Sequence, residues 1–220
     1  MKVQDVFHSA QLKFGMDQTN ARFADDFFAA CTDAQNDLAN RRSWGCLVTS
    51  ATMTTVDGTR TVAVPSTFGR LVEEYGSMRI TSPSASEGSI IKAITLADYT
   101  HASWDSDEEG TPSLVWIEGD YFNFSPVPDA AYTVKYWYYK RPTTVLTTDD
   151  DFTFPDSYME MVKRAIYKRL ADDGYTGVQE LAITENDVER LFRRAALDDE
   201  SRYGAMMFNL PNSGQTIYTT

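Results

Sequence analysis

The chain has 220 residues, of which 42% are hydrophobic and 13% aromatic, and 20 Lys and Arg stand against 32 Asp and Glu, a formal net charge of −12. A chain of this length buries roughly 70% of its unfolded surface, so it is expected to fold rather than remain disordered. The negative charge repels nucleic-acid phosphates and excludes binding by charge alone, unless a basic patch is segregated. Arg190, Arg193 and Arg194 are candidates, but acidic neighbours at helical spacing indicate a mixed-sign, solvated helix face.

The cysteines and the apolar segments indicate a soluble, unexported protein. Cys31 and Cys46 belong to no CxxC pair, and no secretory signal or run of about 18 apolar residues is evident. We therefore expect reduced, structural thiols in a cytosolic setting, and no membrane span.

Two helices are predicted at the start of the chain. Apolar residues from Val3 to Phe14 indicate a short helix that Gly15 ends, because glycine readily takes the left-handed cap conformation. Apolar residues spaced by three and four predict a second, amphipathic helix over residues 20–42, with Asn20 as its N-cap.

From Trp44 the pattern changes to alternation, which is typical of strands. Asp57-Gly58 is predicted to be the tip of a hairpin whose second strand Pro65 closes. Further strands are predicted over residues 70–81, 113–119, 120–126 and 131–139. The stretches between them, including HASWDSDEEGTPS from His101, are expected to be loops.

Helix is predicted again after an acidic linker. One helix is expected from Pro155 to Gly174 and another over residues 177–201. The predicted fold class is α+β, a helical bundle with an inserted antiparallel β-sandwich or barrel-like domain and an extended C-terminal arm. The expected boundaries are 1–43 and 155–203 for the bundle, 44–154 for the β-domain with its linker, and 204–220 for the arm.

The segment YTVKYWYYKRP, residues 132–142, carries five aromatic rings. As a strand it sends alternate residues to one nearly all-apolar face: Tyr132, Val134, Tyr136, Tyr138 and Lys140. The other face mixes polar, basic and aromatic residues. We therefore predict a core strand that Pro142 ends, rather than a base-stacking surface, which would need a basic open groove.

Residues that carry chemistry are sparse. The two histidines, His8 and His101, have no metal-binding or nucleophile motif around them, and no phosphate-binding glycine loop occurs. The three consecutive acids at 149–151 cannot all reach one cation from an extended chain, so a solvated linker is expected. The sequence thus predicts no catalytic residues, no metal site and no cofactor.

Four segments in order resemble a known family. The helix ending in NRRSW runs into the hairpin TTVDGTRTVAVPSTFGRL; GDYFNFSPVPDAAYTVKYWYYKRP follows, and an acidic linker leads to FTFPDSYMEMVKRAIYKRL. This series resembles the head-to-tail adaptor (neck or connector) proteins of tailed bacteriophages, in which a tyrosine-rich strand ending in two basic residues and proline precedes a Pro-initiated helix. The resemblance covers roughly residues 20–200.

The resemblance implies a non-enzymatic structural protein of the virion neck, made in the host cytoplasm. Such adaptors form a ring, typically of twelve copies, beneath the portal protein; they extend the DNA channel and dock a tail or nozzle protein. Genomic DNA passes through the lumen without sequence-specific binding. Trp137 and Tyr139 are then the expected subunit contacts of the β-domain. Portal or subunit contacts of the arm would be Met206, Met207, Phe208, Leu210, Ile217 and Tyr218.

Two alternatives from other classes remain open at this point. A carbohydrate- or ligand-binding β-module would use Trp104, Trp116 and Trp137 as a stacking platform. A glycosidase would need two carboxylates that face one cleft, and spacing in the sequence does not test this.

Overall fold

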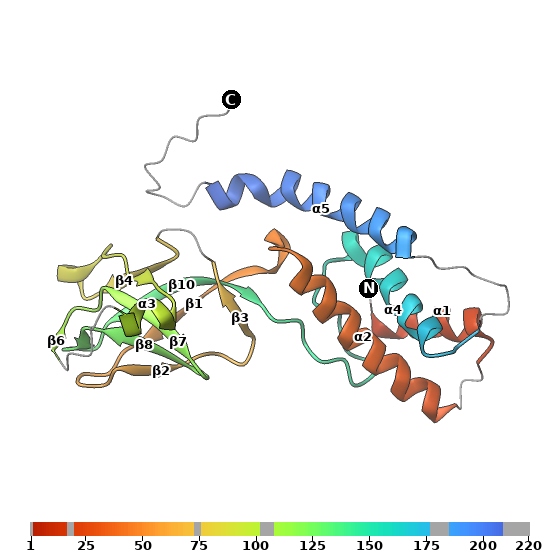
Figure 1. Ribbon diagram of the computed structural model, residues 1–220, viewed down its shortest axis with the longest axis horizontal. Helices are drawn as coiled ribbons and strands as arrows, with labels where there is room; N and C mark the ends of the chain where they lie inside the picture. The colour runs from red at the N-terminus through yellow and green to blue at the C-terminus, as the bar shows by residue number, and fades with distance from the viewer. Residues whose placement is uncertain (1, 17–19, 73–75, 102–107, 177–184, 209–220) are drawn as a thin grey trace. The chain divides into compact units, whose positions relative to one another are not determined.

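A computed structural model describes all residues except 1, 17–19, 73–75, 102–107, 177–184 and 209–220 (Figure 1). The chain forms two compact units. The helical unit comprises Met1–Leu47 and Arg141–Ala205, and the β unit comprises Val48–Lys140 and Met206–Thr220. Helices and sheets thus occur together without closure of a barrel, which confirms the α+β class.

In the described part of the helical unit there are four α-helices: α1 (Val3–Phe14), α2 (Ala21–Arg41), α4 (Met159–Asp172) and α5 (Glu185–Phe208), whose last residues pass the unit's boundary. A short 3-10 helix, η1 (Gly45–Leu47), follows α2, and η3 (Asp156–Tyr158) precedes α4. The predicted caps are confirmed, because Asn20 Oδ1 accepts a 3.1 Å hydrogen bond from the Phe23 amide and Gly15 has φ 65°.

Aromatic rings fill the core of the helical unit. Phe7 on α1 contacts Phe27 on α2 with ring centroids 5.0 Å apart, and Phe14 meets Tyr167 on α4 edge to face at 5.8 Å. A second cluster surrounds the fully buried Trp44, whose ring lies edge-on to Phe154 and Phe192 at 5.5 Å. Each pair has the tilted or edge-to-face geometry that aromatic rings prefer.

The β unit contains two four-stranded sheets and a small pair. In the first sheet the central β10 (Thr133–Lys140) pairs with β1 (Val48–Thr54) on one side and with β3 (Phe68–Leu71) and β4 (Met78–Ser82) on the other. The second sheet has the order β2 (Thr61–Ala63), β8 (Tyr121–Ser125), β7 (Leu114–Glu118), β5 (Lys92–Ala93). The pair consists of β6 (Glu109–Gly110) and β9 (Val127–Pro128).

The two four-stranded sheets share one hydrophobic core. Phe122 on β8 contacts Tyr136 on β10 edge to face at 5.2 Å, and Phe68 on β3 contacts Phe122 at 5.3 Å. Of the residues predicted to share one face of the aromatic segment, Tyr132, Val134, Tyr136 and Tyr138 are buried, and Lys140 at the end of β10 is half-buried. Alternation along β10 therefore predicted its buried face correctly.

The strand pairing differs from the predicted hairpin. A bridge between Val56 and Thr59 closes the turn at Asp57-Gly58, but β1 then pairs with β10 and β2 pairs with β8. The turn therefore carries the chain from one sheet to the other instead of joining two neighbouring strands. Likewise the single strand predicted over 70–81 is two strands, β3 and β4.

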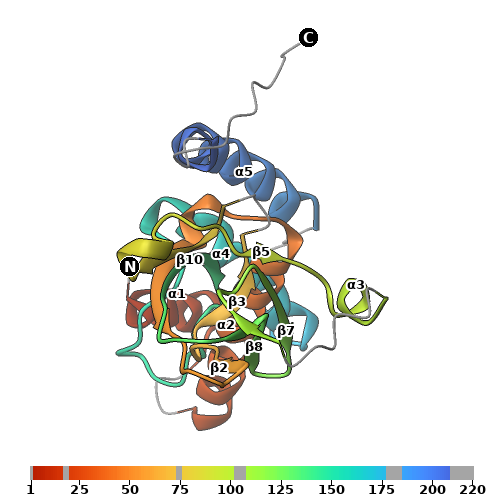
Figure 2. The same cartoon turned by 90° about the vertical axis from the view of Figure 1, so that its left-hand side faces the viewer.

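A short helix, α3 (Leu96–His101), also departs from the predicted loop; it lies against β7, beside the second sheet (Figure 2). Another short element, η2 (Ser84–Ser86), follows β4. Among the residues that the structure describes, no helix has the length and apolar character needed to cross a bilayer.

Candidate interaction surfaces

The described residues contain no recognisable catalytic or metal-binding cluster. His8 lies exposed on α1, and His101 is the last residue of α3. No group of three His, Cys, Asp or Glu side chains in the described part of the chain could hold a metal ion. The Cys31 thiol lies buried on α2, and burial raises its pKa well above the ordinary value.

Two acids of the 149–151 segment, Asp150 and Asp151, have structural roles. The Asp150 carboxylate accepts hydrogen bonds of 2.8 Å from the amides of Leu146 and Thr147, and these bonds lower the pKa of Asp150. Asp151 pairs with Lys2 at 2.9 Å, and the Asp150 carbonyl accepts a bond from the Val3 amide at the start of α1. The segment therefore closes a turn and fastens the N-terminal helix.

Helix α5 is anchored by a buried carboxylate, that of Asp199, which is 2% exposed. Its oxygens accept the amides of Gly45 at 2.7 Å and Cys46 at 3.0 Å, and the Tyr158 hydroxyl at 3.3 Å. Arg42 lies 3.8 Å away. Burial, followed by the charge of Asp199, raises the pKa of Tyr158 above its ordinary value, so the hydroxyl stays a donor. One side chain thus joins α5 to η1, which follows α2, and to Tyr158 of η3.

Close packing accompanies this anchor. A Cβ added at Gly45 would collide with Cβ and Cγ of Tyr203 on α5, so only glycine fits at this approach. The indole nitrogen of Trp44 donates a 2.7 Å bond to the Leu38 carbonyl, which fixes the ring against the cluster described above. Together these contacts set the position of α5 within the helical unit.

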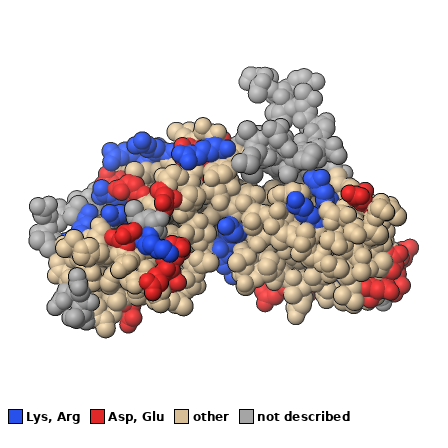
Figure 3. Space-filling model, turned by 180° about the vertical axis from the view of Figure 1, so that it is seen from behind, with Lys and Arg blue, Asp and Glu red and all other residues tan. Residues whose placement is uncertain are grey.

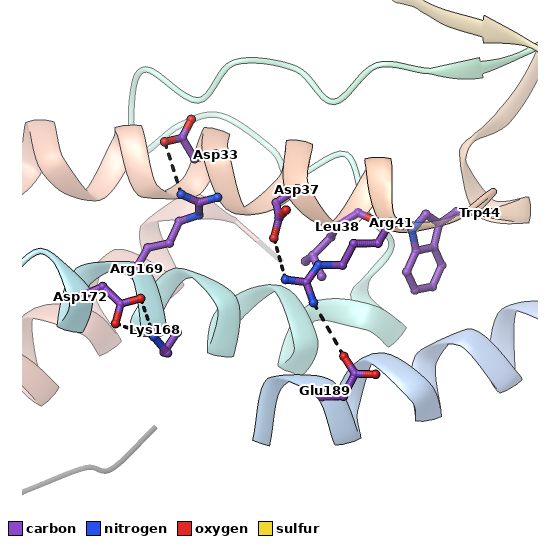
Figure 4. A network of polar contacts seen from close by, with 9 residues as sticks. All are labelled: Asp33, Asp37, Leu38, Arg41, Trp44, Lys168, Arg169, Asp172 and Glu189. Atoms are coloured by element: carbon purple, nitrogen blue, oxygen red, sulfur yellow. Dashed lines mark hydrogen bonds and ion pairs between the residues drawn. The ribbon is translucent and has the colours of Figure 1, made fainter. Parts of the chain in front are cut away.

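Ion pairs along the helices add to the anchor (Figure 4). Arg41 on α2 contacts Asp37 at 2.9 Å and Glu189 on α5 at 3.8 Å. Arg169 on α4 lies 3.8 Å from Asp33 on α2. These pairs are partly exposed, so each contributes little, and they orient the helices rather than hold them.

The outward face of α5 carries exposed arginines beside acidic residues. Arg190, Arg193, Arg194 and Leu197 recur at spacings of three and four and are all exposed, with Leu197 at 68%. Figure 3 shows that Lys and Arg side chains gather along this helix. Arg190 and Arg193 pair with acids of the same helix, Asp187 at 3.5 Å and Glu189 at 3.1 Å. The predicted mixed-sign face is thus confirmed.

The predicted C-terminal arm begins later than expected. Helix α5 continues to Phe208, so the prediction of an extended arm from residue 204 is wrong for residues 204–208, which include Met206, Met207 and Phe208. Ala205, Met206 and Met207 are good helix formers and favour continuation of the helix past Gly204, whereas Pro211 disfavours helix further along the chain. Leu210, Ile217 and Tyr218 lie outside the described residues, and the contact role of all six remains a prediction.

The outer face of the first sheet carries Trp137 and Tyr139. Trp137 is half-buried, and the Arg79 guanidinium carbon and the Lys135 Nζ each lie 5.0 Å from its ring centroid. Tyr139 is only 7% exposed, with Arg70 stacked on it at 4.5 Å. Of the two predicted subunit contacts, Trp137 therefore offers the larger accessible surface.

Of the three tryptophans expected in a stacking platform, Trp116 is buried in the described part of the chain. Trp116 is 2% exposed and lies flat against Tyr99, with centroids 3.7 Å apart. Trp104 lies outside the described residues. A buried ring cannot receive a sugar, so the contacts of Trp116 count against the carbohydrate-binding alternative.

Sequence reasoning missed the anchor of α5 and the Arg79 contact. Asp199 stands between Asp198 and Glu200, so composition does not distinguish it. Its position does, because Val188, Phe192, Ala195 and Asp199 follow one another by three or four residues along a single helix face. Arg79 had no such signal, since the pairing of β4 with β10 brings it to Trp137.

Comparison with known proteins gives one result. Residues 1–210 match the SU10 adaptor protein family, nearly the whole chain. No curated protein matches.

Proposed function

Because the chain belongs to the SU10 adaptor protein family, a structural family of bacteriophages, we propose that it joins the phage head to the tail. In this proposal it docks beneath the portal protein, extends the DNA channel and receives a tail or nozzle protein in the virion neck. The observation that carries the proposal is the family match over residues 1–210.

The proposed working form is a ring of identical subunits, twelve in the adaptors that the sequence resembles. The net charge of −12 supports a conduit function, because an acidic lining lets DNA pass without gripping it. The exposed arginines of α5 offer the opposite charge to an acidic neighbour. A rigid helix with an exposed face is the kind of element on which such contacts are built.

The C-terminal residues are proposed to reach the portal or a neighbouring subunit. The buried contacts of Asp199 and Gly45 fix α5, and the helix then carries Met206, Met207 and Phe208 at its end. Apolar side chains of Leu210, Ile217 and Tyr218 follow in the sequence. Methionine and aromatic residues are enriched at subunit contacts, which favours this assignment.

The proposal is tested by mixing the purified chain with the portal protein of the same phage and imaging the particles by negative-stain electron microscopy. Closed rings stacked on the portal are expected for the full chain. A chain that ends at Phe208 should bind the portal more weakly, whereas Leu12→Ala, at an exposed apolar residue of α1, should bind normally. A full chain that stays monomeric with its portal would contradict the proposal.

A further inference from the structure

Two cations face each other on the outer side of the first sheet of the β unit. Lys135 on β10 and Arg79 on β4 are direct cross-strand partners. Both lie over the ring of Trp137, each at 5.0 Å from its centroid, and all three side chains are half-buried. We call these three residues the cationic face.

Nothing within the described chain neutralises this arrangement. Neither Lys135 nor Arg79 forms an ion pair with a described carboxylate, and the buried Nε of Arg79 has no hydrogen-bond partner. Like charges directly opposite each other on a sheet are destabilising, and an unpaired buried guanidinium N–H adds a further penalty. Both costs fall when an anionic group closes over the cationic face.

A matching anionic surface lies at one end of the same unit. Val56, Asp57, Glu108 and Glu109 are all exposed, Val56 at 59%. The Gly58 amide donates a 2.8 Å bond to the Pro128 carbonyl on β9, and β9 pairs with β6, so the turn and the acids lie together. We call these four residues the acidic tip.

The tip and the face of one copy lie apart. Thr54, which leads into the turn, pairs with Thr133 at the start of β10, whereas Trp137 lies four residues further along the strand. At about 3.3 Å per residue, four residues span roughly 13 Å. Contact between the two surfaces therefore requires two copies.

We propose that the acidic tip of one copy docks on the cationic face of the next. Carboxylates of Asp57, Glu108 and Glu109 would meet Lys135 and Arg79, and Val56 would approach the Trp137 ring. Arginine and tryptophan are the residue types that most often dominate binding energy at interfaces. The partner is a second copy rather than DNA, because a chain of net charge −12 repels phosphate.

This contact is head-to-tail, since it joins two different surfaces. Repeated head-to-tail contacts give a closed ring when the rotation between copies closes, and a filament when it does not. The inference rests on the proposed ring and names one contact that would form it.

The docking inference is tested by reversing one charge on each of the two surfaces. Full-length Lys135→Glu and Glu109→Lys proteins are compared with wild type by sedimentation velocity over a concentration series, alone and with the portal protein. Each variant alone should need about tenfold or more protein to assemble, and an equal mixture of the two should recover assembly, because each then offers the other a complementary surface. Lys92→Glu, at an exposed lysine of β5, is the matched control and should assemble as wild type.

Misfolding is checked independently of assembly. Lys135→Glu places a carboxylate opposite Arg79, so its thermal stability should be no lower than that of the wild type. If wild type and both variants assemble equally, the docking inference is overturned while the adaptor proposal stands. If the wild type forms no ring with or without the portal, the adaptor proposal fails and the inference with it. If Lys135→Glu abolishes binding of duplex DNA but leaves assembly unchanged, the face binds phosphate and the inference is also overturned.

Discussion

Replacing Asp199 by alanine is expected to weaken the helical unit, because several buried donors lose their acceptor at once. The carboxylate, which is 2% exposed, accepts the amides of Gly45 and Cys46 and the hydroxyl of Tyr158. Alanine removes this acceptor from all three donors and removes one of the two carboxylates near Arg42, leaving Glu200 at 3.3 Å. Water reaches this position poorly, so it does not replace the lost acceptor.

The size of the effect follows from those contacts. A hydrogen bond to a charged group contributes about 1.5–3 kcal/mol, and the two bonds from Gly45 and Cys46 are short and direct. The Tyr158 contact at 3.3 Å is longer and adds less. Loss of one partner from a buried charged network costs about 3–5 kcal/mol, and we expect Asp199→Ala to fall in this range.

Urea denaturation of the full chain, followed by circular dichroism at the helical minimum, measures this loss. Asp199→Asn should be intermediate, since an amide oxygen still accepts one of the backbone donors. Asp198→Ala is the control, because that neighbouring acid is 39% exposed and pairs with Arg202 on the surface. Equal stability of the Asp198 and Asp199 variants would refute the assignment of Asp199 as the anchor of α5.

Two further predictions concern the helical unit. Gly45→Ala should destabilise it by about 1–3 kcal/mol, as overpacking does; Tyr203→Gly should restore part of this loss whereas Tyr203→Ala should not, because the collision is with Cβ. Gly110→Ala, where a Cβ finds ordinary contact distances, is the control, and an equal effect at both glycines would contradict the packing argument. In the folded protein the pKa of Asp150 lies below its ordinary value of 3.8. The carboxylate therefore contributes to folding stability above pH 3.8, and this contribution is lost as the pH falls through the lower, folded-state pKa. The stability difference between wild type and Asp150→Ala should therefore shrink in acid, and a pH-independent difference would exclude this role of the carboxylate.

Local patterns predicted elements well where burial repeats along the chain. The alternation of Val134, Tyr136 and Tyr138 gave the inward face of β10, and Asn20 gave the start of α2. These signals lie within a few residues of one another. They depend on the geometry of a single helix or strand, which the sequence carries directly.

Local sequence patterns did not predict which distant strands pair with each other. The turn at Gly58 is local and was predicted, but the choice of β10 as partner of β1 depends on which faces are buried together, more than 70 residues apart in the sequence. The candidate cationic face has the same origin, because Arg79 reaches Trp137 only through the pairing of β4 with β10. The last residues of α5, Met206–Phe208, were predicted to be extended because Pro211 and Gly214 follow them in the sequence. Their own helix propensity was given too little weight.

The measurement closest to the central claim is electron microscopy of particles from phage in which this gene is disrupted. A head-to-tail adaptor is required to join heads to tails, so DNA-filled heads and separate tails should accumulate when the gene is disrupted. Purified wild-type protein added to that lysate should then restore joined, infectious particles. Complete tailed virions formed without the protein would contradict the account.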